Sequence, residues 1–253
     1  MTKKGRLHKR GIVCYDKVIR TGGIKLYYRG VIFDFNGTLF FDSDKHEQAW
    51  SAMSEKLRGK PFTSDEMRTH MHGRNGKMIL AYLMGRMPTE EETAQLTQEK
   101  ESHYRELCLK DPEHLHLAPG AQSLLNWLEK HRVPKAIATA SDIHNVTFYQ
   151  EQFHISTWFA KEQIIYDDGT LKGKPDPDIY ERAAQRLNLA PQDCIVFEDA
   201  ISGIESARRA GAGKIIAVAS FEPRETYQSN SAVSQIIEDF DQFDAQKWLK
   251  SMD

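Results

Sequence analysis

The chain has 253 residues, of which 40% are hydrophobic and 28% charged, so it can bury a core and is not compositionally disordered. Its net charge of −2 argues against a whole-chain electrostatic partner such as duplex DNA or a membrane surface. No apolar run reaches the roughly 18 residues of a membrane helix, and no secretory signal is evident. Three cysteines far apart in sequence fit neither a disulfide framework nor a zinc site. We therefore expect a cytoplasmic protein.

The first 30 residues differ from the rest in charge. They contain nine Lys or Arg and one acid, a charge of +8, so residues 31–253 carry −10. Two short β-prone runs, Lys17–Arg20 and Ile24–Tyr28, flank a Thr-Gly-Gly turn and are compatible with a hairpin. The alternatives are an unstructured basic leader or a start site placed too far upstream. We predict a basic extension over residues 1–30, and no nucleic-acid partner for the remainder of the chain.

From residue 31, short apolar strands alternate with helices. The pattern predicts strands at 31–33, 136–138, 194–197, 214–219 and 235–237, and helices near 121–131, 143–153, 176–188 and 202–211. This alternation is typical of an α/β fold with a doubly wound parallel sheet covered on both faces. Residues 43–115 break the pattern, because they are long, charged and helical by composition. We predict a small all-helical cap at 43–115, inserted after the first strand of a core that comprises 31–42 and 116–253.

Polar residues follow three of the predicted strands, at Asp34, Thr139 and the pair Glu198-Asp199. In open parallel sheets, ligands bind outside the carboxyl ends of the strands, so these side chains should meet in one crevice. Each alone would be weak evidence, because an acid at a strand end is often a helix cap. Together they predict a functional site.

These residue types favour phosphoryl chemistry. Clustered acids repel one another unless a cation lies among them, and carboxylates suit Mg²⁺. Lys174, in the sequence Gly173-Lys174-Pro175, offers a positive charge to a phosphate, and Thr139 offers a hydroxyl. Asp34 is then a candidate covalent nucleophile.

Four segments carry the chemistry-bearing residues in this order: Asp34-Phe35-Asn36-Gly37-Thr38-Leu39, Thr139-Ala140-Ser141, Gly173-Lys174-Pro175-Asp176-Pro177 and Phe197-Glu198-Asp199-Ala200-Ile201-Ser202-Gly203. They resemble the four motifs of the haloacid dehalogenase superfamily, and the resemblance covers about residues 31–240. The helical insertion is similar to the small cap of the β-phosphoglucomutase and phosphoglycolate-phosphatase-like branch, where Asp44, His46 and Trp50 also fit.

The resemblance implies a Mg²⁺-dependent phosphatase that hydrolyses a small phosphate monoester, such as a sugar phosphate, through an aspartyl-phosphate on Asp34. Thr139 and Lys174 would hold the phosphoryl oxygens, and Ala140 and Ser141 would line the substrate site. The implied metal ligands are Asp34, Glu198, Asp199 and the backbone carbonyl of Asn36.

Asn36 departs from the family pattern, which has a second Asp there as general acid and base. An amide has no proton that titrates near neutral pH, and general acid–base catalysis is worth roughly 10²–10⁴-fold. Three interpretations stay open. The protein is a phosphatase that uses another acid (Asp42, Asp44 or His46), a substrate group, or a leaving group that needs no proton. It cleaves phosphonates, with Lys77 as a Schiff-base lysine. Or it binds a phosphorylated ligand without turnover.

The cap should select the substrate. The segment 72–77 is the best candidate for a specificity loop, because its glycines allow close approach and Arg74 or Lys77 can grip an anion. The alternative is an ordinary turn with solvated charges, and His46 is equally open to a structural interpretation. Asp142-Ile143, after Ser141, offers little to a second phosphate, which favours a phosphomonoesterase over a bisphosphate mutase. The sequence leaves the oligomeric state open.

Overall fold

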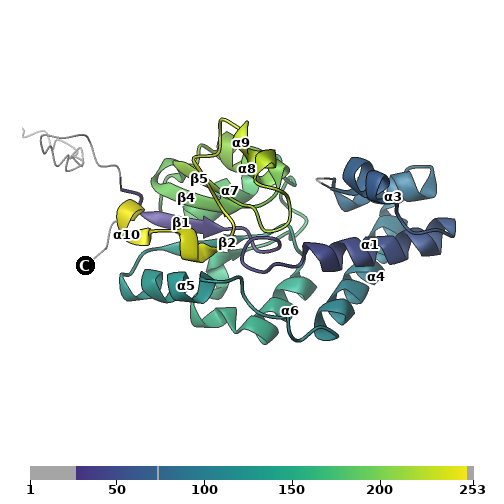
Figure 1. Cartoon of the computed structure of the whole chain (residues 1–253), viewed down its shortest axis with the longest axis horizontal. Coiled ribbons are helices and arrows are strands. Elements are labelled where there is room, and N and C mark those ends of the chain that lie inside the picture. The colour runs from purple at the N-terminus through teal and green to yellow at the C-terminus, as the bar shows by residue number, and fades with distance from the viewer. Residues whose placement is uncertain (1–26, 73, 250–253) are drawn as a thin grey trace, which may run out of the picture.

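The computed structural model describes residues 27–72 and 74–249 (Figure 1). Within them, one sheet of six parallel strands has the order β3-β2-β1-β4-β5-β6. The chain moves outward from β1 through β2 and β3, then returns to the other side of β1 for the remaining strands. The predicted doubly wound α/β fold is therefore confirmed. The strands are β1 (Gly30–Phe33), β2 (Lys135–Ala138), β3 (Ile164–Ile165), β4 (Cys194–Glu198), β5 (Lys214–Val218) and β6 (Gln235–Ile237).

Helices cover both faces of the sheet (Figure 1). One face packs against α5 (Ala121–Lys130), α6 (Ile143–Phe153) and the C-terminal α10 (Ala245–Trp248). The other face packs against α7 (Asp178–Arg186), α8 (Ile201–Ala210) and α9 (Glu225–Gln228). The helices therefore cover the two faces of the sheet, and the carboxyl ends of the strands stay available for a site.

Side-chain alternation along the strands builds the two halves of the core. In β1, Val31 and Phe33 face the α5–α6 side, whereas Ile32 faces the α7–α8 side. Successive residues of a strand point to opposite faces, so a strand buried on both faces must be apolar throughout. This explains why the predicted strands are continuous apolar runs. Phe33 also stacks on Phe197 of the neighbouring β4, with ring centroids 5.2 Å apart.

The segment after β1 forms helices that lie to one side of the sheet (Figure 1). They are α1 (Ser43–Arg58), α2 (Ser64–Glu66), a π-helical turn (Met67–Met71), α3 (Gly76–Met84) and α4 (Glu90–Leu109). They share a separate apolar cluster, and no strand occurs among the described residues of 43–115. The arrangement is consistent with the predicted cap, whose boundaries stay a prediction. The cluster contains Trp50, Met53, Phe62, Ile79, Leu80, Leu83 and Leu96.

Two features differ from the sequence predictions. The short strand β3 was not predicted, because two isoleucines give no periodicity to detect. The structured core also begins before residue 31, since Tyr28 pairs with Leu249 in a parallel bridge and Gly30 opens β1. The predicted extension therefore loses its last residues to the core, and its first 26 residues, with the proposed hairpin run Lys17–Arg20, lie outside the described residues. None of the described helices is long and apolar enough to cross a membrane.

Gly120, at the start of α5, tests how tightly α5 packs against the segment around Phe240 and Asp241. Its φ is +74°, and a Cβ there would lie 2.4 Å from the backbone nitrogen of Asp241. Gly120→Ala should lower the free energy of unfolding by about 2–4 kcal/mol, since backbone strain and overpacking each cost about 1–3 kcal/mol. Gly211→Ala is the matched control, with φ +80° and open space around the position. Urea unfolding should show the smaller loss for Gly211→Ala, and equal losses would contradict the packing argument.

Candidate active site

Three central strands deliver the predicted polar residues to one edge of the sheet. Asp34 follows β1, Thr139 follows the adjacent β2, and Glu198 and Asp199 end the adjacent β4. Carboxylate oxygens of the three acids lie within 4.8 Å of one another. This is the point where the strand order reverses, which is where open α/β sheets form their ligand crevice.

Lys174 lies among these acids. Its Nζ donates to Asp34 Oδ1 at 2.6 Å and to Glu198 Oε1 at 2.5 Å, and its side chain is only 9% exposed. The loop before α7 supplies this lysine, and the Lys174–Pro175 peptide bond is cis. Tyr180 of α7 lies beneath the ammonium, with the ring centroid 5.2 Å from Nζ, and donates its hydroxyl to Glu198. The ammonium is therefore fixed by two carboxylates and one aromatic face.

The pKa values of this cluster show that its negative charge is only partly compensated. Burial raises the pKa of Asp34 to about 7, and the Glu198 charge adds to that effect while Lys174 opposes it. Burial also raises the pKa of Asp199 well above its usual range, reinforced by the charges of Glu198 and Asp34. For Lys174, burial alone would lower the pKa, but the Asp34 and Glu198 carboxylates outweigh it and raise the pKa. One lysine thus faces three acids.

Two glycines let the backbone approach the acids closely. Gly37 has φ +71°, and a Cβ there would lie 2.1 Å from Asp199 Oδ2. A Cβ on Gly203 of α8 would lie 1.6 Å from Glu198 Oε1. Any larger residue would push a carboxylate away from the site.

The side chain of Asn36 lies between the site and a buried polar cluster. Its Nδ2 donates to Asp42 Oδ2 and to the hydroxyl of Tyr149, each at 2.6 Å, and more weakly to Tyr104 at 3.3 Å. Its Oδ1 accepts from Ser141 Oγ at 2.8 Å and faces Thr139 Oγ1 at 3.4 Å. The structure thus brings three of the predicted site residues together.

Asp42 was considered only as a substitute acid, yet it is the centre of that cluster and is fully buried. Its Oδ1 accepts from the backbone N–H of Gly37 at 2.9 Å, and its Oδ2 accepts a short hydrogen bond from Tyr104. Burial would raise the pKa of Asp42, but hydrogen bonds from His46, Tyr104 and Asn36 outweigh it and lower the pKa. Asp42 is therefore a charged carboxylate whose neighbours are donors.

The two tyrosines of the cluster are residues that the sequence did not indicate. Burial and the charge of Asp42 raise the pKa of both Tyr104 and Tyr149 well above the usual range, so both stay neutral donors. Tyr149 is held by stacking on Phe35, with ring centroids 4.2 Å apart. They come from α4 and α6, far along the chain from the residues that they bind: Tyr104 donates to Asp42, and Tyr149 accepts from the amide of Asn36.

His46 joins this cluster through α1. Its ring stacks on Tyr104 with a centroid distance of 4.0 Å, and its Nε2 lies 3.4 Å from Asp42 Oδ2. Its Nδ1 lies 2.7 Å from the Nζ of Lys100, a lysine of α4 that is only 2% exposed. His46 therefore has partners on both nitrogens, and its predicted contact with substrate stays a prediction.

The other predicted cap residues lie in more exposed surroundings. Arg74 is exposed and has no side-chain hydrogen bond or ion pair among the described residues. Lys77 is 39% exposed and forms an ion pair with Glu90 at 2.5 Å. Asp44 is 51% exposed and pairs with Lys45. Ala140, a predicted site residue of the core and not of the cap, is exposed beside Thr139 at the edge of the sheet.

One end of the predicted specificity loop contacts the core. His72 Nε2 lies 2.6 Å from Glu47 of α1, and its Nδ1 lies 3.3 Å from Glu222, in the segment after β5. The ring also meets Phe221 edge to face, with centroids 6.0 Å apart. His72 therefore connects the cap with a loop at the carboxyl end of the sheet.

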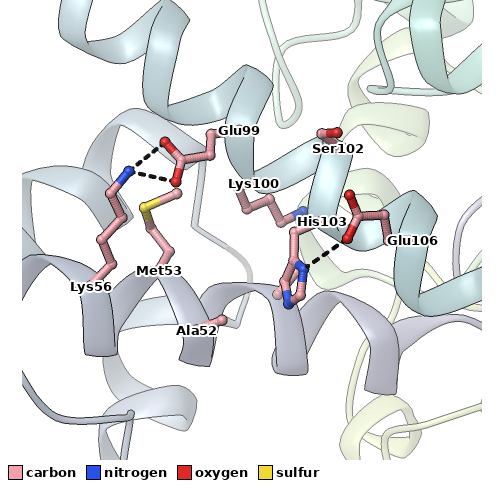
Figure 2. Close-up of a pocket in the computed structure, with 9 residues that line it drawn as sticks. Ala52, Met53, Lys56, Glu99, Lys100, Ser102, His103 and Glu106 are labelled. Carbon is pink, nitrogen blue, oxygen red and sulfur yellow. Dashed lines mark hydrogen bonds and ion pairs between the residues drawn. The ribbon is translucent and has the colours of Figure 1, made fainter.

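A shallow cavity of about 410 Å³ lies between α1 and α4 (Figure 2). Two ion pairs line it, Lys56 with Glu99 at 2.5 Å and His103 with Glu106 at 3.8 Å. It holds none of the predicted site residues. The strand-end cluster therefore remains the best-supported site.

Comparison with known proteins agrees with this geometry. Residues 28–211 match the haloacid dehalogenase-like hydrolase family. The chain is 29% identical to a phosphorylated carbohydrates phosphatase of Thermotoga maritima, over 74% of this chain and 84% of that protein. It is 32% identical to a β-phosphoglucomutase of Bacillus subtilis, over 72% of this chain and 80% of that one.

A solved structure supports the same assignment. The crystal structure of a family IA, variant 3 hydrolase of the same superfamily from Entamoeba histolytica is 36% identical to the chain and superposes with a TM-score of 0.82. The match covers 87% of this chain and 96% of that one. The chain therefore belongs to the haloacid dehalogenase-like hydrolases.

Proposed function

We propose that the protein is a Mg²⁺-dependent phosphatase of small phosphorylated metabolites, of the sugar phosphate class, and that Asp34 is its nucleophile. The observation that carries the proposal is the position of Asp34, held by Lys174 at 2.6 Å beside Glu198 and Asp199. The relative named as a phosphatase of phosphorylated carbohydrates supports the substrate class. Thr139, at the neighbouring strand end, adds a hydroxyl for a phosphoryl oxygen.

The donor set fits Mg²⁺, which prefers carboxylate oxygens, water and a substrate phosphate. Both oxygens of Glu198 already accept hydrogen bonds, from Lys174 and Tyr180 on one and from the N–H of Ala200 on the other. Asp34 and Asp199 each keep a carboxylate oxygen without a donor among the described residues. These two, with the backbone carbonyl of Asn36, would hold the ion. When bound, Mg²⁺ would polarise the phosphoryl group and neutralise its charge.

Two displacements at phosphorus complete the proposed reaction. An Asp34 oxygen attacks phosphorus, and the bond from phosphorus to the leaving oxygen breaks with its electron pair on that oxygen. Water then attacks the aspartyl-phosphate, and Asp34 is released with inorganic phosphate. Lys174 remains bonded to Oδ1 and fixes the orientation of the carboxylate throughout.

The protein supplies little acid catalysis to the leaving group. Asn36 has no titratable proton, and Asp42, Tyr104 and Tyr149 are at most 1% exposed. Within the proposed class, we therefore expect the best substrates to be those with the least basic leaving oxygen, which departs most easily without a proton from the enzyme. The phosphonate alternative is less well supported, because Lys77 is an exposed partner of Glu90 and not a buried amine.

Loss of the nucleophile is the direct test of the proposal. Purified protein with Mg²⁺ should release phosphate from a panel of phosphorylated metabolites. Asp34→Asn should lower kcat by at least about 10³-fold, since an amide cannot form the acyl-phosphate. Asp65→Asn is the matched control, because Asp65 is an exposed acid of the cap whose one side-chain partner among the described residues is Arg68. Equal activity of Asp34→Asn and wild type would refute the covalent route, and an inactive wild type would favour the non-catalytic interpretation.

The absence of a general acid at position 36 should make kcat/KM depend on the pKa of the leaving group. Across a series of aryl and alkyl phosphates, kcat/KM should fall steeply as the pKa of the leaving alcohol rises. We expect alkyl substrates to be disadvantaged by roughly 10²–10⁴-fold, the range that general acid catalysis normally contributes. Stopped-flow measurement with a nitrophenyl phosphate should also show a burst, since no base assists hydrolysis of the intermediate. A flat dependence on leaving-group pKa would mean that another residue donates the proton.

The charge imbalance predicts a pH effect on stability without metal. Because the pKa of Asp34 is raised from 3.8 to about 7 on folding, the folded state binds more protons than the unfolded state between these values. The free energy of unfolding should therefore fall as pH rises through this window, by up to about 4 kcal/mol from this group. Urea unfolding in EDTA should show Asp34→Asn gaining stability over wild type from pH 4 to pH 8, and Asp65→Asn showing no such trend. If the difference in free energy of unfolding between Asp34→Asn and wild type did not change with pH, the charge argument would be contradicted.

A further inference from the structure

The cluster around Asp42 consists of donors only. Its two oxygens accept from the N–H of Gly37, from the amide of Asn36 and from the hydroxyl of Tyr104. The fourth neighbour, His46, has its Nε2 3.4 Å from Oδ2. A buried carboxylate with this many donors is a satisfied charge that needs no cation.

Lys100 determines the tautomer of that histidine. An ammonium can only donate, so the Nδ1 of His46, at 2.7 Å from Lys100 Nζ, must accept. The proton of the neutral ring is then on Nε2, which faces Asp42. Lys100 is in turn held by Glu101 at 2.9 Å and lies over the rings of Trp50 and Tyr104. The surroundings of Asp42 are therefore fixed from two cap helices.

Asp42 in turn determines the orientation of Asn36. A carboxylate cannot donate, so the atom of Asn36 that lies 2.6 Å from Asp42 Oδ2 must be the NH₂ group. The amide oxygen then points the other way, toward Ser141 Oγ at 2.8 Å and Thr139 Oγ1 at 3.4 Å. Asn36 thus links a buried charge to the hydroxyls at the edge of the active site.

A carboxylate at position 36 would not be tolerated beside Asp42. It would place two charged oxygens about as close as the present 2.6 Å hydrogen bond, one of them on the fully buried Asp42. Two like charges at that distance cannot both be ionised without a large cost. An aspartate at 36 could therefore stand beside Asp42 only if one of the two kept its proton, at a cost that the present amide–carboxylate pair avoids.

We propose that Asn36 and Asp42 are a matched amide–carboxylate pair. Asn36 is a positioning residue, and the carboxylate of the pair is the buried Asp42 and not the residue at position 36. This inference rests on the proposed phosphatase function. It predicts that Asn36→Asp alone is harmful, although it restores the residue that the family pattern has there. Exchange of the two residues, as Asn36→Asp with Asp42→Asn, should place an acid at 36 without the second charge.

The test compares the two single variants and the double variant in the full chain with Mg²⁺. Asn36→Asp should lower kcat/KM for p-nitrophenyl phosphate at least about tenfold and lower Tm by about 5–10 °C. Asp42→Asn should also lose both activity and stability. The double variant should recover the wild-type Tm to within a few degrees, and its kcat/KM for glycerol 2-phosphate should exceed wild type at least about tenfold.

A control acid separates pairing from simple removal of charge. Asn36→Asp combined with Asp65→Asn removes the same net charge at an exposed position and should rescue neither Tm nor activity. A gain of activity in Asn36→Asp alone, or losses in the double variant that equal the sum of the single losses, would overturn the proposal.

The stability measurement distinguishes this proposal from the proposed function. If wild type and all variants release no phosphate from any substrate, the phosphatase assignment fails, and recovery of Tm in the double variant still supports the pair. If single variants do not fold, a folded double variant supports the pair. An unfolded double variant with folded single variants would refute it.

Discussion

The ammonium of Lys174 between Asp34 and Glu198 is the interaction on which the proposed active site depends. Three acids at one sheet edge, two of them buried, would be strongly unfavourable without a cation, because removal of charge from water is costly unless it is paired. Lys174 is bonded to two of the acids within 2.6 Å and is itself held over Tyr180. It compensates only part of the charge, so the cluster is kept in place with negative charge left over for the proposed Mg²⁺.

The sheet determines where that cluster forms. β1 lies between β2 and β4, so residues that follow these strands must converge whatever the cap does. The continuous apolar runs and the polar residues that end them were therefore sufficient to predict the sheet and the convergence of Asp34, Thr139 and Glu198. β3 was missed for the opposite reason: it is two residues long and its pairing with β2 depends on position, not on a local pattern.

The surroundings of Asn36 could not be predicted in the same way. Tyr104 and Tyr149 lie 68 and 113 residues from Asn36 in sequence, on helices whose local patterns indicate only which face is buried. A tyrosine on the buried face of an amphipathic helix is ordinarily a core residue, and nothing in the sequence shows where its hydroxyl finds a partner. Lys100 is similar, because a lysine in a charged helix is ordinarily solvated, yet this one is 2% exposed beside His46. Such contacts depend on how the cap helices pack against the core.

Aspartates at the same edge of the fold thus have opposite roles, set by their surroundings. Asp34 and Asp199 each keep an oxygen without a donor among the described residues, and burial raises the pKa of both. Asp42 is enclosed by donors, and its pKa is lowered. Unsatisfied charge is what a metal or a reacting phosphoryl group can use, whereas satisfied charge can only orient its neighbours. Asn36 lies on the boundary between these two environments. The amide donates to the satisfied carboxylate while its oxygen accepts from the hydroxyls of the site, and an ionised carboxylate at 36 could not donate, so the residue at 36 is matched to the residue at 42.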